Sequence, residues 1–176
     1  MHRALAEPVP VPRRVAALGI AGWSGSGKTT LITALIPALM QRGLSVSTIK
    51  HAHHLLALDQ PGKDSFRHAE AGAAEVMLAT EAGFALYSKH QPDLPALLAR
   101  LAPVDLVLVE GYKDHDMPKL EVYRPSLGKP PLWPDRRIMA VLSDVALPDC
   151  PVPVLPLGAV AQIADYILIA VRLKQL

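Results

Sequence analysis

One octapeptide near the start of this 176-residue chain narrows its possible folds more than any other segment: Gly22-Trp23-Ser24-Gly25-Ser26-Gly27-Lys28-Thr29. It has the Walker A form, G-x-x-x-x-G-K-[ST], in which glycines let backbone N–H groups wrap around a phosphate. The apolar run 15–20 before it predicts a strand, and the segment 30–41 after it has the spacing of a helix. The octapeptide therefore predicts a P-loop that binds a nucleoside di- or triphosphate.

Each part of this P-loop has a predicted role. Lys28 is expected to reach the β- and γ-phosphates, and it is also our first catalytic candidate. The Thr29 hydroxyl is expected to ligate magnesium. The other predicted nucleotide contacts come from the loop and the first helical turn: Gly22, Ser24, Gly25, Ser26, Gly27 and Thr30.

Strand-like and helix-like segments alternate through the rest of the chain, which indicates an α/β fold. The expected strands are 44–49, 74–80, 83–87, 105–110, 120–123 and 137–143, and the expected helices are 64–72, 92–101 and 158–173. We predict a three-layer P-loop NTPase-type fold with a mainly parallel, partly mixed central sheet. Residues 1–14, rich in proline, are predicted to be a flexible tail, and 15–176 a single nucleotide-binding domain.

Composition argues against several functional classes. The formal net charge is only +2 and no Lys or Arg run exceeds two residues, so nucleic acid is not an expected partner. No apolar stretch approaches the length of a membrane span and the chain begins without a signal-peptide core, which predicts a cytoplasmic protein. A single cysteine, Cys150, excludes an internal disulfide.

Two carboxylates follow predicted strands, where ligands of parallel sheets bind. Glu110 ends the apolar run 106–109 and is predicted to hold magnesium directly or through a water. Asp144 follows a similar run, and an aspartate can accept hydrogen bonds from the N1–H and exocyclic amine of guanine. Asp144 is thus a candidate for base selection. The usual Asn-Lys-x-Asp guanine motif is absent, and an aspartate after a strand is also typical of a plain turn.

A basic segment follows the second predicted strand. Lys50 and His51 come directly after it, and Lys63 and Arg67 lie in a polar segment that enters the next helix. Together they predict an anion-binding rim beside the γ-phosphate, in which Lys50, His51 and Lys63 contact the nucleotide. Arg67, Arg124 and Lys113 are candidates for a cation that assists phosphoryl transfer, but each is interpreted as a surface charge. The proline-rich stretch 125–134 is interpreted as an exposed loop.

Two aspartates near this rim, Asp59 and Asp64, are further catalytic candidates that could orient a water or support the metal. Turn or cap chemistry is the alternative explanation for each. The neighbouring histidines, His51, His53 and His54, could bind a metal, but no other His or Cys pair has the spacing that completes a structural zinc site.

These residues together resemble the molybdopterin-guanine dinucleotide biosynthesis protein B family, GTP-binding adaptors of molybdenum-cofactor maturation. The resemblance covers nearly everything from Val15 to the end of the chain, but it does not include the loop from Pro125 to Pro134. It rests on the order and spacing of short pieces: the P-loop at 22–29, Ile49-Lys50-His51 with His53-His54, residues 59–65 with Ala71-Gly72-Ala73, Val109-Glu110-Gly111-Tyr112-Lys113, and Ser143-Asp144.

This resemblance implies a homodimer that binds GTP with magnesium and hydrolyses it slowly. It further implies that the protein assists the guanylyltransferase that converts molybdopterin cofactor to its guanine dinucleotide form. The implied partners are that guanylyltransferase, the molybdenum-insertion proteins, and molybdopterin or its guanine dinucleotide.

Slow hydrolysis is also expected from the residues, because no motif places a glutamine to position water or an arginine to stabilise the transition state. The chain is therefore at most a slow magnesium-dependent GTPase. Two other classes stay open. A small-molecule kinase would bind ATP at the P-loop and an acceptor at the basic rim, although no arginine-rich lid segment is present. A nickel or cobalt metallochaperone GTPase would use the three histidines, although such proteins commonly carry a longer histidine tract or a cysteine pair.

Overall fold

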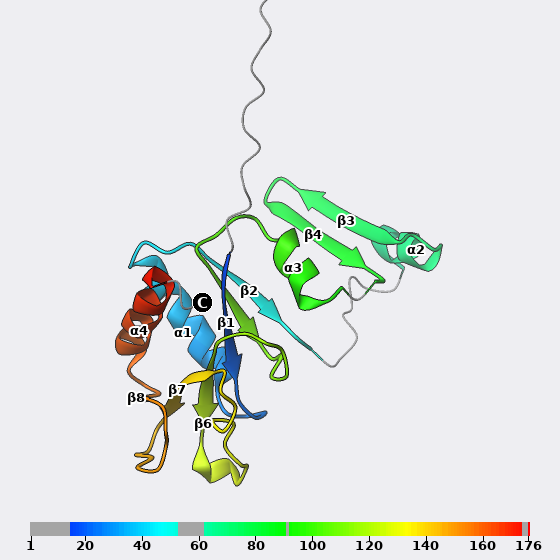
Figure 1. Ribbon diagram of the computed structural model, residues 1–176. Helices are drawn as coiled ribbons and strands as arrows, with labels where there is room; N and C mark the ends of the chain where they lie inside the picture. The colour runs from blue at the N-terminus through cyan, green and yellow to red at the C-terminus, as the bar shows by residue number, and fades with distance from the viewer. Residues whose placement is uncertain (1–14, 53–61, 91, 174–175) are drawn as a thin grey trace, which may run out of the picture. The chain divides into compact units, whose positions relative to one another are not determined.

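The computed structural model describes residues 15–52, 62–90, 92–173 and 176 and divides into two compact units (Figure 1). The first unit contains the chain up to His51 and from Leu101 onward, and the second contains Ala52–Arg100. The P-loop belongs to the first unit. The tail at 1–14 lies outside the described residues, and a single domain over 15–176 stays a prediction.

A six-stranded parallel sheet forms the centre of the first unit. Its order is β2-β5-β1-β6-β7-β8, and all five pairings are parallel. The strands are β1 (Ala16–Ala21), β2 (Val46–Lys50), β5 (Leu106–Glu110), β6 (Lys119–Tyr123), β7 (Ile138–Ser143) and β8 (Val154–Pro156). Parallel strands are covered on both faces and read as continuous apolar runs, which explains why residues 106–109 are fully buried. The predicted α/β fold with a mainly parallel sheet is confirmed.

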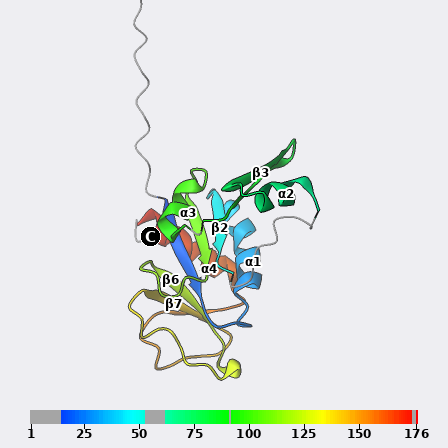
Figure 2. The same ribbon diagram turned by 90° about the vertical axis from the view of Figure 1, so that its right-hand side faces the viewer.

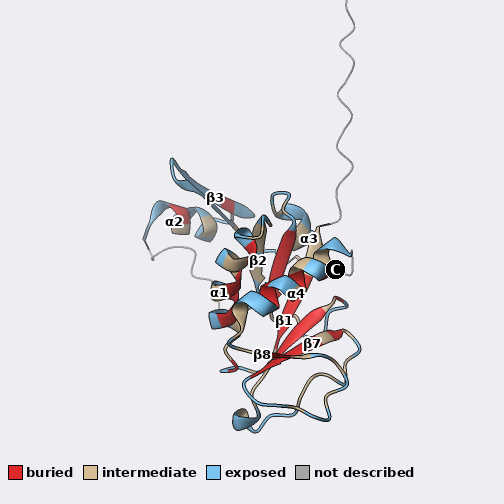
Figure 3. Ribbon diagram, turned by 90° about the vertical axis from the view of Figure 1, so that its left-hand side faces the viewer, coloured by how far each residue is buried: buried red, intermediate tan, exposed pale blue. Residues whose placement is uncertain are grey.

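Two helices of the first unit, α1 (Lys28–Met40) and α4 (Val160–Arg172), pack against each other and against one face of this sheet (Figures 1 and 3). Their buried side chains join those of the strands in one hydrophobic core: Leu31, Ile32, Leu35 and Leu39 from α1, Ile163, Ala164 and Ile167 from α4, and residues such as Leu18, Ile20, Leu108 and Leu142 from the sheet. None of the described helices is long and apolar enough to cross a membrane.

The second unit contains an antiparallel hairpin and two short helices. The hairpin joins β3 (Glu75–Thr80) to β4 (Gly83–Ser88) and forms a sheet of its own, so the antiparallel pairing lies outside the central sheet. The helices are α2 (Asp64–Glu70) and α3 (Leu94–Arg100). An ion pair of 2.9 Å joins Arg100 to Glu75.

The stretch 125–134 was predicted to be an exposed loop, and this is only partly correct. It begins with a short 3₁₀ turn, Pro125–Leu127, which the sequence did not predict, and its residues 131–133 are partly buried. Leu132 and Trp133 pack beside a small cluster of buried residues of the sheet, including Ile138 and Val141. The stretch is therefore part of the packing of the sheet.

Two charged side chains of β6 are fully buried. The Lys119 ammonium donates to the carbonyl oxygens of His115 and Met117, and burial lowers its pKa. Glu121 accepts a 2.8 Å hydrogen bond from the Leu132 N–H at Oε1, whereas no described residue bonds its buried Oε2. Burial raises the pKa of the Glu121 carboxyl, because the charged form loses its hydration, and backbone hydrogen bonds oppose this shift.

We expect Glu121→Gln to change how stability depends on pH. The pKa of Glu121 is higher in the folded than in the unfolded state, so the unfolded chain loses this proton first as the pH rises. Urea unfolding of the wild type and of Glu121→Gln gives the difference between their free energies of unfolding. This stability advantage of the wild type should fall as the pH rises from about 4.3, the ordinary pKa of glutamate, through the raised pKa. Glu81→Gln, at an exposed turn, is the control and should lack this trend. A constant difference between wild type and Glu121→Gln would contradict the assignment.

Candidate functional site

The P-loop connects the end of β1 to the start of α1, as predicted. Gly27 is the N-cap of α1 and has a left-handed backbone with φ of 100°. Gly22 has φ of 139°, and a Cβ at this position would lie 2.5 Å from the carbonyl oxygen of Val122. No other residue fits that space, so the close approach of β6 fixes the turn that opens the loop. The N-terminus of α1, where anions bind, follows directly.

Lys28 lies in the first turn of α1 and reaches back across the loop. Its ammonium donates a 2.8 Å hydrogen bond to the carbonyl oxygen of Trp23. Partial burial lowers the pKa of Lys28, while the nearby Glu110 carboxylate raises it and the Lys50 ammonium lowers it. A phosphate bound in the loop would restore the interactions that this ammonium loses on burial.

Three predicted residues meet where β2, β5 and α1 come together. The Thr29 hydroxyl donates to Oε1 of Glu110 at 2.9 Å. The Lys50 ammonium lies 3.4 Å from the same Oε1 and 3.3 Å from the Thr29 hydroxyl oxygen. Parallel pairing of β2 with β5 sets Lys50 opposite Glu110, which accounts for this meeting.

The Thr29 and Glu110 oxygens fit a magnesium ion as neighbouring ligands. Magnesium binds oxygens in an octahedron at about 2.0–2.1 Å, so two neighbouring ligands lie about 2.9 Å apart. The observed distance between these oxygens is 2.9 Å. Lys50 was predicted to contact phosphate, and its ammonium reaches the oxygens of this same pair.

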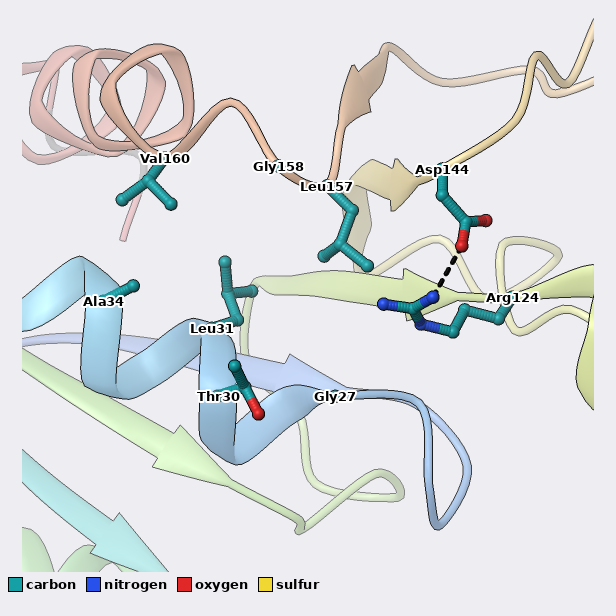
Figure 4. Close-up of a pocket in the computed structure, with 9 residues that line it drawn as sticks. All are labelled: Gly27, Thr30, Leu31, Ala34, Arg124, Asp144, Leu157, Gly158 and Val160. Atoms are coloured by element: carbon teal, nitrogen blue, oxygen red, sulfur yellow. Dashed lines mark hydrogen bonds and ion pairs between the residues drawn. The ribbon is translucent and has the colours of Figure 1, made fainter.

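A pocket of about 440 Å³ opens beside the P-loop (Figure 4). Its lining comes from the start of α1, from the residues that follow β6 and β7, and from the connection between β8 and α4: Gly27, Thr30, Leu31, Ala34, Arg124, Asp144, Leu157, Gly158 and Val160. The lining is mostly apolar with one polar pair, which is typical of small-molecule sites. Gly27, Thr30 and Asp144 were predicted site residues, and the structure brings them to this one pocket.

Arg124 supplies the polar partner of Asp144 in the pocket. Its guanidinium donates to Oδ2 of Asp144 at 2.6 Å (Figure 4). Its Nε donates to the carbonyl oxygen of Ser26 at 3.0 Å. The sequence interpretation of Arg124 as a surface charge therefore missed its place in the site. Arg124 directly follows a strand, as Asp144 does, and this position was the signal that could have identified it.

His51 and Tyr112 form a ring contact at the ends of β2 and β5, with ring centroids 4.7 Å apart. Tyr112 has an unusual left-handed backbone with φ of 49°. A Cβ on the preceding residue, Gly111, would lie 2.9 Å from Cβ of His51, so the contact depends on glycine there. The predicted contact of His51 with the nucleotide stays a prediction.

The other predicted residues of this region lie in the second unit or outside the described residues. Lys63 and Asp64 lie in the second unit, where Lys63 is the N-cap of α2 and Asp64 is its first residue. A carboxylate in the first turn stabilises a helix, which favours the structural explanation of Asp64. Asp59, with His53 and His54, lies outside the described residues.

Comparison with known proteins places the chain in a family. The family model described as molybdopterin guanine dinucleotide synthesis protein B matches residues 17–144. The chain belongs to this family. The matched range includes the P-loop, Glu110 and Asp144, and it ends before the pocket residues Leu157 and Val160.

Relatives of known name agree with membership of the molybdopterin guanine dinucleotide synthesis protein B family. The chain is 40% identical over 158 residues to the molybdopterin-guanine dinucleotide biosynthesis adapter protein of Escherichia coli (strain K12), covering 85% of this chain and 90% of that one. It is 41% identical over 156 residues to the adapter protein of Haemophilus influenzae, covering 85% and 86%. A crystal structure of molybdopterin-guanine biosynthesis protein B matches with a TM-score of 0.69 at 29% identity, covering 86% and 97%. The family resemblance inferred from sequence is confirmed.

We expect Lys28→Ala to weaken nucleotide binding severely. The substitution removes an ammonium that several phosphate oxygens would share, and hydrogen bonds to charged groups contribute about 1.5–3 kcal/mol, so magnesium-GTP affinity should fall by about one to two orders of magnitude. Calorimetric titration measures this loss. Arg172→Ala removes an equal charge from the exposed end of α4 and should bind as the wild type does. Unchanged affinity in Lys28→Ala would refute the site.

Proposed function

We propose that this chain is a GTP-binding adapter of molybdopterin guanine dinucleotide biosynthesis. In this role it assists the guanylyltransferase that converts molybdopterin cofactor to the guanine dinucleotide. The observation that carries the proposal is the pocket beside the P-loop, in which Asp144 lies next to the first turn of α1. Family membership and the adapter names of the similar proteins support it.

Different residues of the P-loop region would bind the phosphates and the magnesium ion of a nucleoside triphosphate. The loop and the N-terminus of α1 would bind the phosphates through backbone N–H groups, and Lys28 would neutralise their charge. Thr29 and Glu110 would hold magnesium, whose positive charge would offset the negative charge of the phosphates. Lys50 lies within 3.4 Å of both ligands' oxygens, which places its charge beside the same phosphates.

Asp144 is our candidate for selecting guanine. A carboxylate can accept about four hydrogen bonds, and the Arg124 bond uses Oδ2. Capacity therefore remains for the N1–H and exocyclic amine of guanine, a pair of donors that adenine lacks. Arg124 also fixes the direction of the carboxylate, because its Nε is held by the carbonyl oxygen of Ser26 in the P-loop.

Hydrolysis by this arrangement is expected to be slow. Efficient phosphoryl transfer needs, in addition to the P-loop lysine, an arginine that stabilises the transition state and a positioned water. Arg124 is engaged with Asp144 and Ser26. Asp59 and Asp64 remain our candidates for orienting a water, and the adapter is at most a slow GTPase.

We further propose that the adapter is a homodimer that associates through the hairpin β3–β4. The register pairs Met77 with Leu86 and Ala79 with Phe84, so these four side chains share one face of the hairpin. Met77 is 60% exposed, Leu86 40% and Phe84 72%. An isolated two-stranded hairpin is marginally stable, and an exposed apolar face marks an interaction surface. A second copy would present the same face, which a two-fold axis can pair with itself.

The guanine proposal is tested by calorimetric titration of GTP and ATP with magnesium. The wild type should prefer GTP, and Asp144→Asn should weaken GTP binding about tenfold or more, since it replaces one acceptor of a charged pair with a donor, while ATP binding changes little. Asp149→Asn, at an exposed position before β8, is the control and should keep the preference. Equal or tighter ATP binding by the wild type would contradict the proposal and favour a kinase.

The dimer proposal is tested by sedimentation of Phe84→Glu. A buried charge without a partner costs several kcal/mol, so this substitution should convert a wild-type dimer to monomer. Ile169→Glu places the same charge at a 57% exposed position on α4 and should leave the dimer intact. A monomeric wild type, or a Phe84→Glu protein that stays dimeric, would overturn the proposed hairpin interface.

A further inference from the structure

Residues 124–133 follow β6 in the connection to β7 (Figure 2), and they contact the P-loop at Trp23 and Ser26 and approach it at Gly25. The Trp23 indole Nε1 donates a 2.8 Å hydrogen bond to the carbonyl oxygen of Pro130. Arg124 donates to the carbonyl oxygen of Ser26, and a Cβ on Gly25 would meet the Leu127 side chain at 3.9 Å. Movement of the P-loop would therefore change the contacts of the segment 124–133.

The same segment is anchored to the sheet at its far end. The N–H of Leu132 is held by the buried Glu121 carboxylate at 2.8 Å, and Trp133 packs edge-to-face on Tyr123 with centroids 4.9 Å apart. Between Arg124 and these anchors, the exposed residues include Pro125, Gly128, Lys129 and Pro130. Proline restricts the backbone in advance, so such a segment loses little conformational entropy when a partner binds.

Lys129 is the one exposed charged residue of this segment, since Arg124 is partly buried and paired with Asp144. Residues 124–133 contain an arginine and a lysine and no aspartate or glutamate. The ammonium of Lys129 lies 5.8 Å from the Trp23 ring centroid, and that of Lys113, from the loop after β5, lies 5.3 Å from it. Neither ammonium forms an ion pair with a residue that the structure describes. Two exposed positive charges thus flank an aromatic side chain of the P-loop.

We propose that residues 124–133, with Trp23 and Lys113, form a docking surface for an acidic face of a protein partner, and that the nucleotide controls this surface through Trp23. The inference rests on the proposed function, in which the partner is the guanylyltransferase. Charge complementarity across such a surface gives specificity and speeds association. The pocket that we assign to guanine is bordered by Arg124 at the other end of the same segment, so one segment adjoins both ligands.

The control by nucleotide follows from the hydrogen bonds of Trp23. In the structure its carbonyl oxygen accepts a bond from the Lys28 ammonium, and its indole donates to Pro130. A bound phosphate competes for the same ammonium, so it changes the interactions of Trp23 and, through the indole, those of Pro130. A ligand shifts a conformational equilibrium by its different affinity for the two states, and Lys28 supplies that difference.

The first test measures this coupling without a partner. The chain has two tryptophans, so Trp133→Phe leaves Trp23 as the single indole fluorophore. Saturation with GTP and magnesium should change the intensity or the wavelength of Trp23 emission, at a concentration that matches the calorimetric affinity. Trp133→Phe with unchanged emission, in a sample that binds GTP in the calorimeter, would overturn the proposed control by nucleotide.

The second test measures the docking surface with the guanylyltransferase of the same organism immobilised on a biosensor. Lys129→Glu should weaken binding about tenfold or more and reduce its dependence on salt, and Lys129→Ala should have an intermediate effect. Arg172→Glu makes the same charge change on α4 and is the control. Lys129→Glu, Lys129→Ala and Arg172→Glu should all bind GTP with the wild-type affinity.

The outcomes separate the docking surface from the function on which it rests. Equal binding by Lys129→Glu and Arg172→Glu would overturn the docking surface and leave the adapter role intact. A wild type that binds GTP but never binds the guanylyltransferase, with or without nucleotide, would overturn the proposed partnership itself. Tight binding that depends on GTP and is lost in Lys129→Glu would support both.

Discussion

The central position of β1 is the constraint on which the site depends. Because β1 pairs with β5 on one side and β6 on the other, the P-loop at its end has Glu110 on one side and the segment 124–133 on the other. Glu110, the carboxylate proposed to hold magnesium, comes from the first side, and the contacts of Arg124 come from the second. The approach of Val122 to Gly22 shows how tightly this packing holds the loop.

Buried and paired charges hold the parts of the site in place. Arg124 links the phosphate-binding and pocket ends of the site through Ser26 and Asp144. Glu121 also holds a loop in place, because its buried carboxylate accepts a hydrogen bond from the N–H of Leu132. Such a buried carboxylate destabilises the folded state when it is ionised. Its hydrogen bond nevertheless holds the loop in place.

The sequence predicted the parts of the site that a local motif encodes. Lys28, Thr29 and Glu110 follow from such local patterns, and the structure places Thr29 within hydrogen-bond distance of Glu110. The position of Arg124 after a strand marks it only as a candidate, and Leu157 has no such mark. The strand order places the residues that follow β6 and β8 at one pocket with the start of α1, and no local pattern reveals that order. The three-residue β8 was too short to recognise, and Glu121 was unexpected because a charged residue in a strand normally faces solvent.

The second unit also connects strand β2 to strand β5. It occupies the chain between β2 and β5, which are parallel neighbours, and such a pair needs a crossover that returns the chain to the starting end of the sheet. A single helix commonly suffices for this return, whereas this chain uses the 49 residues of Ala52–Arg100. Its hairpin can therefore change in length or sequence without shifting the register of β2 on β5. Lys50 and Glu110 would stay opposite each other while the hairpin adapts to a different neighbour.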